Sequence, residues 1–311
     1  MDPERAALIV SSVVRGAQLR ESHGGLYCLE LGSGRQRQLI DWNTTDIDVE
    51  GRGGDRGLRG IAIHGDSIFV AASRALLHFD SGMRLLHAYV NDYLRHCHEV
   101  SIHAGTAYVV STGFDSVLGF DLERREFTSG LHLRHDAAGL RVLAFDPRRV
   151  PGPGPGNAFH LNGVHCDASG IYFSGLRTPG LLRVAQGRLA SHAPLPAGTH
   201  NAQPWRGSGV VYNDTANDCL RARSADGEIA IRYAALDGAA HDWTHAEDAR
   251  LARPLFGRGL CVLSDRYVAG GQSPSTITLY DLQEQRIVQQ LALSRDVRNA
   301  VHGLTVWPFA V

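Results

Sequence analysis

Short apolar runs of about six residues recur along the chain, and turns rich in Gly and Asp separate them. One stretch shows the pattern well, with runs at 61–63, 67–72, 75–80 and 85–89 and a short connection after each. Runs of this length that are bounded by turn residues predict antiparallel strands, because helices need longer periodic segments. The pattern therefore predicts an all-β protein.

The runs group into repeats of four strands with a period of about 40 residues, which is typical of a β-propeller. Two longer intervals contain insertions, the Pro/Gly run 150–156 and the segment 242–248, for which we expect a short helix. The N-terminal segment has three strands, and the strand from His302 supplies the fourth. We therefore predict a six-bladed β-propeller that is closed by the C-terminal strand. A β-sandwich followed by a smaller domain is the alternative.

We expect one domain over residues 1–311, because all-β rings of this length commonly form a single domain. Closing the ring removes sheet edges that would otherwise pair with other chains. The predicted blades are 1–50 with 299–311, 57–91, 98–134, 159–195, 199–234 and 257–294.

The charge balance makes several classes of partner unexpected. The chain has 31 basic and 32 acidic residues, so we expect no basic surface for nucleic acid or for an anionic membrane. We also find no signal-peptide pattern and no run of about 20 apolar residues, which predicts a cytoplasmic protein outside the membrane. Five cysteines without Cys-x-x-Cys spacing favour reduced thiols.

The first residues of the innermost strands are the candidates for chemistry, because these strands of a propeller all start at one face. Histidines begin three alternating blades, and we predict that His98, His200 and His302 bind one transition metal ion and leave open positions for a substrate. We expect iron(II), with zinc, manganese or copper as alternatives. A shift of two residues in the alignment would replace a ligand by another histidine of the list His96, His160 and His165. Hydrogen bonds between imidazoles and water are the structural alternative.

Arginines begin two of the other blades. Guanidinium groups bind carboxylate or phosphate through two parallel hydrogen bonds, so we predict that Arg59 and Arg258 bind an anionic small molecule. The residues predicted to complete this substrate site are Asn162, Asp115 and Asp214. Ion pairs of the arginines with Asp115, Asp214 or Glu99 are the alternative.

Two further residues are candidates for proton transfer. Glu99 directly follows a predicted metal ligand, and His165 lies three positions after Asn162. We predict one of them as the catalytic base. A solvated carboxylate in a turn is the alternative for Glu99.

Three segments of the chain resemble an uncharacterised bacterial family, a domain of unknown function that is predicted as a propeller. The segments are Phe-His-Leu-Asn-Gly at 159–163, Thr-His-Asn-Ala-Gln-Pro-Trp at 199–205, and Gly-Arg-Gly-Leu at 257–260 with Tyr-Val-Ala-Gly at 267–270. The family form of the second segment is closer to Pro-His-Ser-Pro-Arg-Trp, from which Asn201 and Gln203 depart. The resemblance spans about 95–272 and implies a fold and equivalent positions, without a reaction.

These features lead to three hypotheses about function. The first is a mononuclear metalloenzyme, an iron(II) oxygenase or oxidase, that acts on an anionic small molecule at the channel mouth. The second is a lyase or isomerase that uses the metal as a Lewis acid. The third is a propeller without catalytic activity that binds a protein partner.

Overall fold

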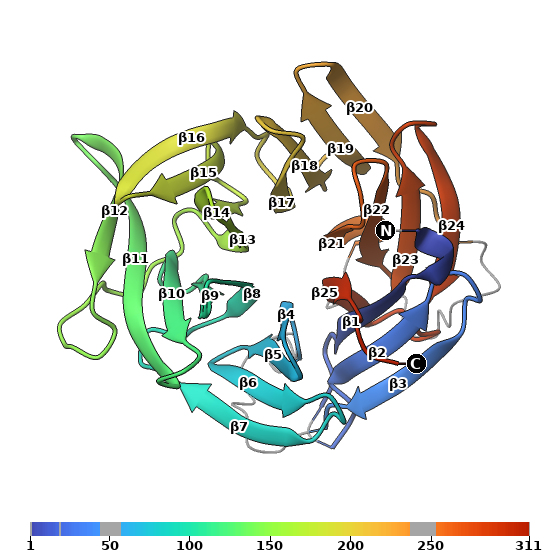
Figure 1. The fold of residues 1–311 in the computed structure, drawn as a ribbon, viewed down its shortest axis with the longest axis horizontal. Helices are drawn as coiled ribbons and strands as arrows, with labels where there is room; N and C mark the ends of the chain where they lie inside the picture. Colours follow the sequence, from blue (N-terminus) through green and yellow to red (C-terminus); the bar gives the residue numbers. More distant parts are fainter. Residues whose placement is uncertain (1, 19, 44–56, 237–252, 311) are drawn as a thin grey trace. The chain divides into compact units, whose positions relative to one another are not determined.

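The computed structural model describes residues 2–18, 20–43, 57–236 and 253–310. They form six antiparallel sheets that follow one another along the sequence (Figure 1). Consecutive sheets with their strands in sequential order are the blades of a β-propeller, so the predicted six-bladed β-propeller is confirmed. Within these ranges no helix is long and apolar enough to cross a membrane.

The strands belong to two compact units, residues 1–61 with 211–311 and residues 62–210. In the first unit, one sheet has the order β25-β1-β2-β3. Its elements are the 3-10 helix η1 (Pro3–Arg5), β1 (Ala7–Val14), β2 (Gly24–Glu30), β3 (Gln36–Asp41) and β25 (Asn299–Val306). β25 runs antiparallel to β1, with Leu8 opposite Val306 and Val14 opposite Asn299. The prediction that the C-terminal strand completes the N-terminal blade is therefore confirmed.

A second sheet of this unit follows the order of the sequence. Its strands are β21 (Phe256–Val262), β22 (Tyr267–Ser273), β23 (Thr276–Asp281) and β24 (Arg286–Ala292). Apolar side chains from both sheets form one core, which includes Leu8, Val10, Leu29, Leu279 and Val301. All eight residues of β1 are buried, because β1 lies between β25 and β2 and packs on both faces.

The second unit holds three further sheets. The strands of the first are β4 (Ile61–His64), β5 (Ser67–Ala72), β6 (Ala75–Asp80) and β7 (Leu85–Val90). Those of the next are β8 (Cys97–His103), β9 (Thr106–Ser111), β10 (Ser116–Asp121), β11 (Glu126–Asp136) and β12 (Gly139–Phe145). Those of the third are β13 (Leu161–Asp167), β14 (Gly170–Gly175), β15 (Gly180–Ala185) and β16 (Arg188–Pro194). The last sheet comprises β17 (Thr199–Trp205), β18 (Gly209–Asp214), β19 (Cys219–Ser224) and β20 (Gly227–Arg232).

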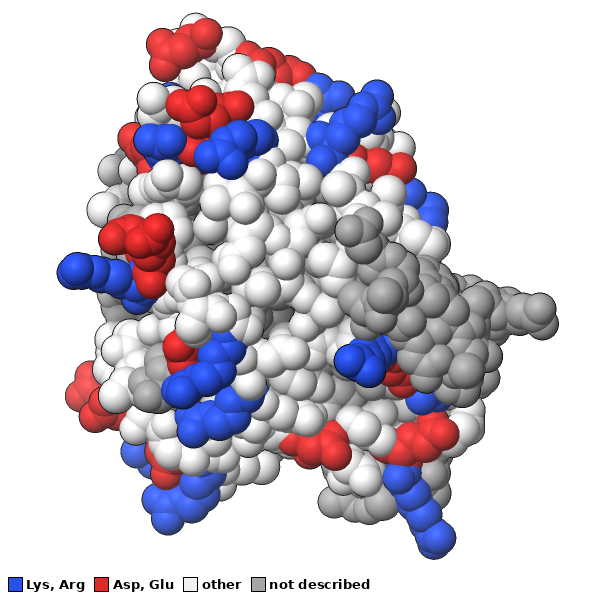
Figure 2. Space-filling model, turned by 90° about the vertical axis from the view of Figure 1, so that its right-hand side faces the viewer, with Lys and Arg blue, Asp and Glu red and all other residues white. Residues whose placement is uncertain are grey.

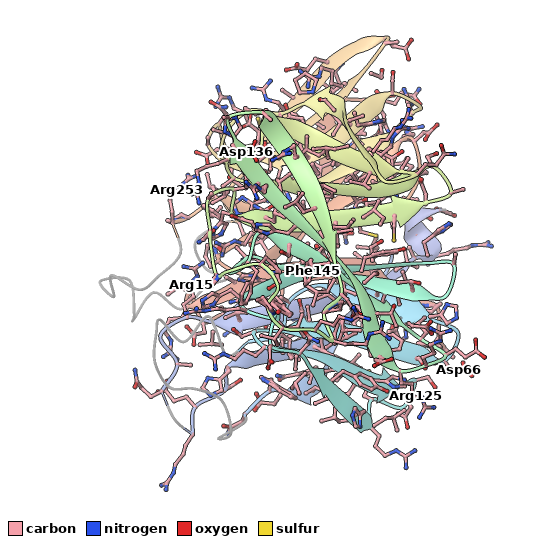
Figure 3. The ribbon with its side chains drawn as sticks, turned by 90° about the vertical axis from the view of Figure 1, so that its left-hand side faces the viewer. Arg15, Asp66, Arg125, Asp136, Phe145 and Arg253 are labelled. Atoms are coloured by element: carbon pink, nitrogen blue, oxygen red, sulfur yellow. The ribbon has the colours of Figure 1, made fainter. Side chains whose placement is uncertain are left out.

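One blade has a fifth strand that the predicted boundaries 98–134 left out. β11 continues to Asp136, and β12 folds back along it from Gly139 to Phe145. Figure 3 labels Asp136 near this turn and Phe145 at the end of β12. The Phe145 ring packs so closely over Gly130 that a Cβ there would lie 2.3 Å from it, and it meets the Tyr93 ring edge-on at 5.2 Å. The predicted helix at 242–248 lies outside the described residues.

Candidate functional site

A β-bulge occurs near the start of four innermost strands, β8, β13, β21 and β25. The extra residue is His302 in β25, Asn162 in β13 and Gly259 directly after Arg258 in β21. In β8 the pairing skips from Cys97 to Val100, which places His98 and Glu99 in the bulge. Bulges redirect side chains and are frequent next to functional sites. Four predicted site residues therefore lie in such bulges, and Arg258 lies directly before one; the four are His98, Glu99, Asn162 and His302.

In the first unit, Ser11 holds Arg59 and β25 together. The Ser11 hydroxyl donates a hydrogen bond to the carbonyl oxygen of Arg59 (2.5 Å) and accepts one from the backbone N–H of Gly303 (2.7 Å). A side chain at Gly303 is excluded, because a Cβ would lie 2.3 Å from that same carbonyl oxygen. This close packing fixes the backbone of Arg59, of which 4% is exposed.

A hydrogen-bond chain fixes the bulge that carries Arg258. The Tyr233 hydroxyl donates to the amide oxygen of Asn213 (3.0 Å), and the Asn213 amide donates to the carbonyl oxygen of Gly259 (3.1 Å). Gly259 has φ +74°, a conformation that glycine adopts without strain. The bulge is thus held from behind by two buried side chains of the same unit.

The Arg258 guanidinium contacts an aromatic ring and an imidazole. It lies 4.4 Å from the centre of the Phe256 ring, and its Nη1 lies 3.4 Å from Nε2 of His302. A guanidinium has no acceptor, so His302 Nε2 accepts this long hydrogen bond and the His302 proton is on Nδ1. The structure therefore brings together Arg258 and His302, two residues to which the sequence assigned different roles.

The charge of Arg258 lies in an unfavourable environment. Burial lowers the pKa of its guanidinium well below the usual range, and the positive charges of Arg15 and Arg59 lower it further. Since a guanidinium keeps its proton in proteins, this shift indicates an electrostatic cost instead of a neutral arginine. Figure 3 labels Arg15, which directly follows β1. We call Arg15, Arg59, Arg258 and His302 the arginine cluster.

Several arginines elsewhere on the protein have acidic partners. Arg266 pairs with Asp281 at 2.7 Å, and Arg35 pairs with Glu30 at 2.8 Å. On the face drawn in Figure 2, basic and acidic side chains are interspersed. Exposed pairs of this kind contribute roughly 0–1 kcal/mol each. The environment of Arg258 differs, because the charges that shift its pKa are both positive.

In the second unit, β8, β13 and β17 lie side by side and place a polar cluster at their starts. His98 Nδ1 lies 2.7 Å from the carbonyl oxygen of His96 and 2.8 Å from the Thr112 hydroxyl. His200 Nδ1 lies 3.3 Å from the carbonyl oxygen of Gly198. A carbonyl only accepts, so both imidazoles carry their proton on Nδ1 and have Nε2 as the acceptor nitrogen.

Glu99 and Asn201 form a hydrogen-bonded pair between β8 and β17. The Asn201 amide donates to the Glu99 carboxyl (2.8 Å). Gly163 of the intervening strand has no side chain, and a Cβ there would lie 3.5 Å from the Asn201 backbone. Burial raises the pKa of Glu99 to about 8, although hydrogen bonds from Val100 and Asn201 oppose the rise. Glu99 is therefore predominantly a neutral acid at pH 7.

Asn162 and Asp115 organise the backbone around this polar cluster. The Asn162 amide donates to the carbonyl oxygen of Thr199 (3.1 Å). Both oxygens of the buried Asp115 carboxylate accept backbone N–H groups, from Ala158 and Phe159 on one side and from Leu161 on the other. Asp115 thereby fixes the segment that leads into β13. The predicted ligand contacts of Asn162 and Asp115 stay predictions.

The two remaining predicted residues also have protein partners. The Asp214 carboxylate, 1% exposed, accepts a hydrogen bond from Nε of Arg221 at 2.6 Å. His165 faces Tyr172 of β14, with ring centres 6.1 Å apart, and burial lowers the pKa of its imidazole. Asp115, Asp214 and Glu99 thus each have a described partner other than Arg59 or Arg258.

Metal binding needs several ligands in one place. Among the described residues, no group of three or more His, Cys, Asp or Glu side chains is placed to hold a metal ion. His98 and His200 belong to one unit and His302 to the other. The predicted three-histidine site, including its alternatives His96 and His160, stays a prediction.

Similarity to known proteins is limited to the fold. No family model matches the chain, and no curated protein matches its sequence. A chain of a nidogen/laminin complex has a TM-score of 0.59 at 9% identity and covers 96% of this chain and 98% of its own. A protein of unknown function from Bacteroides caccae has a TM-score of 0.56 at 11% identity, with coverage of 98% and 100%. Apo AztD from Citrobacter koseri has a TM-score of 0.50 at 12% identity, with coverage of 97% and 98%.

The likeness is one of fold alone. Identities near 10% carry no information about ligands or reactions. The resemblance to the uncharacterised bacterial family stays a prediction, and the function has to be argued from the side chains.

Sequence reasoning missed Arg15, although it identified the ends of other second strands as part of the site. Arg15 follows β1, which is the second strand of its blade, and Thr112 follows β9 in the equivalent place. The alignment of the repeats contains a signal for these positions, since the predicted residues Asp115 and Asp214 occupy the same region of their own blades. Asn201 was noted only as a departure from the resembling family, although its amide binds Glu99.

Proposed function

We propose that the protein binds an anionic small molecule, a carboxylate or a phosphate, at the arginine cluster. One observation carries this proposal: the Arg258 guanidinium is buried and close enough to Arg15 and Arg59 for their positive charges to lower its pKa further. Burying like charges close to one another costs free energy. A bound anion lowers this cost, because it attracts each of the guanidinium groups.

The chemistry of the cluster defines the class of ligand. Guanidinium groups recognise planar carboxylates and phosphate oxygens through paired hydrogen bonds. The carboxylates considered as internal partners, Asp115, Asp214 and Glu99, are bound to backbone N–H groups, Arg221 and Asn201. The Phe256 ring holds the Arg258 guanidinium in place from one face, which lowers the entropy lost when the anion binds.

Thermal unfolding with inorganic phosphate and with succinate tests this function. At constant ionic strength, one of these anions is expected to raise the midpoint temperature of unfolding in a saturable manner. At an anion concentration of ten times its Kd, the free energy of unfolding increases by about 1.4 kcal/mol. Saturation separates binding from the general stabilising effect of excluded salts, which grows steadily with concentration. The proposal would be contradicted if phosphate and succinate each shift the unfolding midpoint by no more than chloride does.

A metal-dependent reaction is the second candidate, and the histidine tautomers favour it. His98 and His200 both point Nδ1 to a carbonyl oxygen two residues earlier. This arrangement fixes Nε2 as the nitrogen with the lone pair, as in most metal-binding histidines. We propose an iron(II) oxygenase or oxidase with His98, His200 and His302 as ligands and Glu99 or His165 as the proton-transfer group. A metal-dependent lyase or isomerase is the alternative.

Metal analysis of protein purified without chelator tests this second candidate. We expect about one transition metal ion per chain, lost in His200→Ala and retained in His192→Ala, whose ring binds the Gly209 carbonyl oxygen at 3.1 Å. Oxygen uptake with a turned-over substrate distinguishes the oxygenase from the lyase. If the purified protein contains no stoichiometric metal, the hypothesis of a propeller that binds a partner and has no catalytic activity is favoured instead.

A further inference from the structure

β20 is the outermost strand of its sheet. The order is β17-β18-β19-β20, and Figure 1 shows β19 between β18 and β20. Among the described strands, none pairs with the outer edge of β20. An edge strand presents a row of backbone N–H and C=O groups that another strand can bind.

The backbone of β20 is regular over its whole length. It pairs with β19 from Cys219 opposite Arg232 to Ser224 opposite Gly227, without a register shift. The residues on either side of a two-residue hairpin turn, here Ser224 and Gly227, form a hydrogen-bonded pair. Pairs without hydrogen bonds and pairs with hydrogen bonds then alternate along the hairpin. The N–H and C=O groups of Glu228, Ala230 and Arg232 therefore point away from β19, toward the outer edge of the sheet.

The other blades protect their outer strands. A register shift interrupts the pairing of β3, β7, β16 and β24 with the strand inside each of them. β11 has the same kind of shift and is in addition covered by β12. Bulges twist an edge away from straight pairing, and β20 has none in its pairing with β19.

We propose that β20 pairs with β20 of a second copy of this chain, antiparallel and centred on Ala230. In this register the outward backbone groups of Glu228, Ala230 and Arg232 meet those of the partner and form about six hydrogen bonds. The twofold axis passes through the centre of the strand, so the interface is isologous. The two sheets join into one.

The side chains of β20 are self-complementary in the same register. Glu228 of each copy lies opposite Arg232 of the other, and Ala230 lies opposite itself. The side chains of Glu228, Ala230 and Arg232 are exposed, whereas Ile229 and Ile231 are partly or fully buried. A register centred on Glu228 would place two carboxylates opposite each other, and one centred on Arg232 would place two guanidiniums together. Backbone and charge therefore favour the same pairing.

Glu228 is already held in position for this contact. The Arg221 guanidinium binds both Glu228 and the buried Asp214. A carboxylate that is fixed by a neighbour loses less side-chain entropy when a second guanidinium binds it. The Arg232 guanidinium of the second copy is the proposed second partner.

Molar mass in solution tests the pairing. By sedimentation equilibrium, wild-type protein is expected to form a dimer that dissociates on dilution. Glu228→Arg or Arg232→Glu alone is expected to weaken the dimer at least about tenfold, because like charges then face each other twice. The double variant Glu228→Arg with Arg232→Glu is expected to dimerise more tightly than either single variant, because the intermolecular pairs re-form with exchanged signs, and more weakly than the wild type, because the pair with Arg221 is lost.

Ala230→Pro supplies a test through the backbone. The Ala230 N–H points away from β19, so proline removes an intermolecular donor and leaves the hairpin ladder intact. We expect a monomer that unfolds at the midpoint of the wild type. The proposal is overturned if wild-type protein stays monomeric at about 100 µM. It is also overturned if the single charge reversals leave the dimer unchanged.

Discussion

Deletion of residues 299–311 is expected to unfold the N-terminal blade and with it the protein. β25 contributes Val301 and Leu304 to the core of its unit, and Trp307 after it is 6% exposed. Removing three such side chains costs about 2–5 kcal/mol each, a sum comparable with the total stability of about 5–15 kcal/mol of most domains. The deletion also leaves β1, buried along its whole length, with an unpaired edge.

Circular dichroism and limited proteolysis measure this effect. A truncation after Trp307, which keeps β25 whole, is the matched control and is expected to unfold like the full chain. A peptide of residues 299–311 added to the longer deletion is expected to restore resistance to protease, because it can supply the missing strand. A deletion variant with the midpoint of the full chain would show that β25 does not close the blade.

Replacement of Arg258 by Met is expected to abolish the stabilisation by the anion and to stabilise the ligand-free protein. Met removes a buried charge that two further cations oppose, and replacing buried charges by apolar groups often adds about 1–4 kcal/mol of stability. Thermal unfolding with and without phosphate or succinate measures both effects in one experiment. The ligand-free protein should become more stable while the stabilisation by the anion is lost. Damage to the fold would instead lower the stability of the ligand-free protein.

Arg253→Met is the matched control for this variant. Arg253 also lies over the Phe256 ring, at 5.7 Å, but it pairs with Asp218 at 2.6 Å. We expect it to retain the full response to the anion. An Arg258→Met protein that is stabilised by the anion as strongly as the wild type would exclude Arg258 from the binding site.

The fold was predictable because its signals are local. The starts at Asn162, His200 and Arg258 recur with the period of the blades, and the missing strand of the first blade matched the extra strand at the C-terminus. The fifth strand β12 was missed because its segment lies between the predicted blades 98–134 and 159–195, in the interval that contains the Pro/Gly run. Its position depends on the Phe145 ring packing over Gly130, a contact that the repeat pattern does not contain.

The side-chain partners were less predictable than the positions. That His302 would meet Arg258 depends on how β21 and β25 pack, and these strands are about 40 residues apart in sequence. Likewise, the pairing of Glu99 with Asn201 depends on how β8 and β17 pack on the two sides of β13. Sequence repeats indicate which residues are equivalent, whereas their contacts follow from the bulges and from the packing between blades.

A crystal structure of the protein grown with phosphate or with succinate tests the central claim most directly. The account predicts an anion with oxygens about 3 Å from the guanidinium nitrogens of Arg258 and Arg59, in paired hydrogen bonds. An acidic side chain of the protein in that place, forming an ion pair with Arg258, would contradict it.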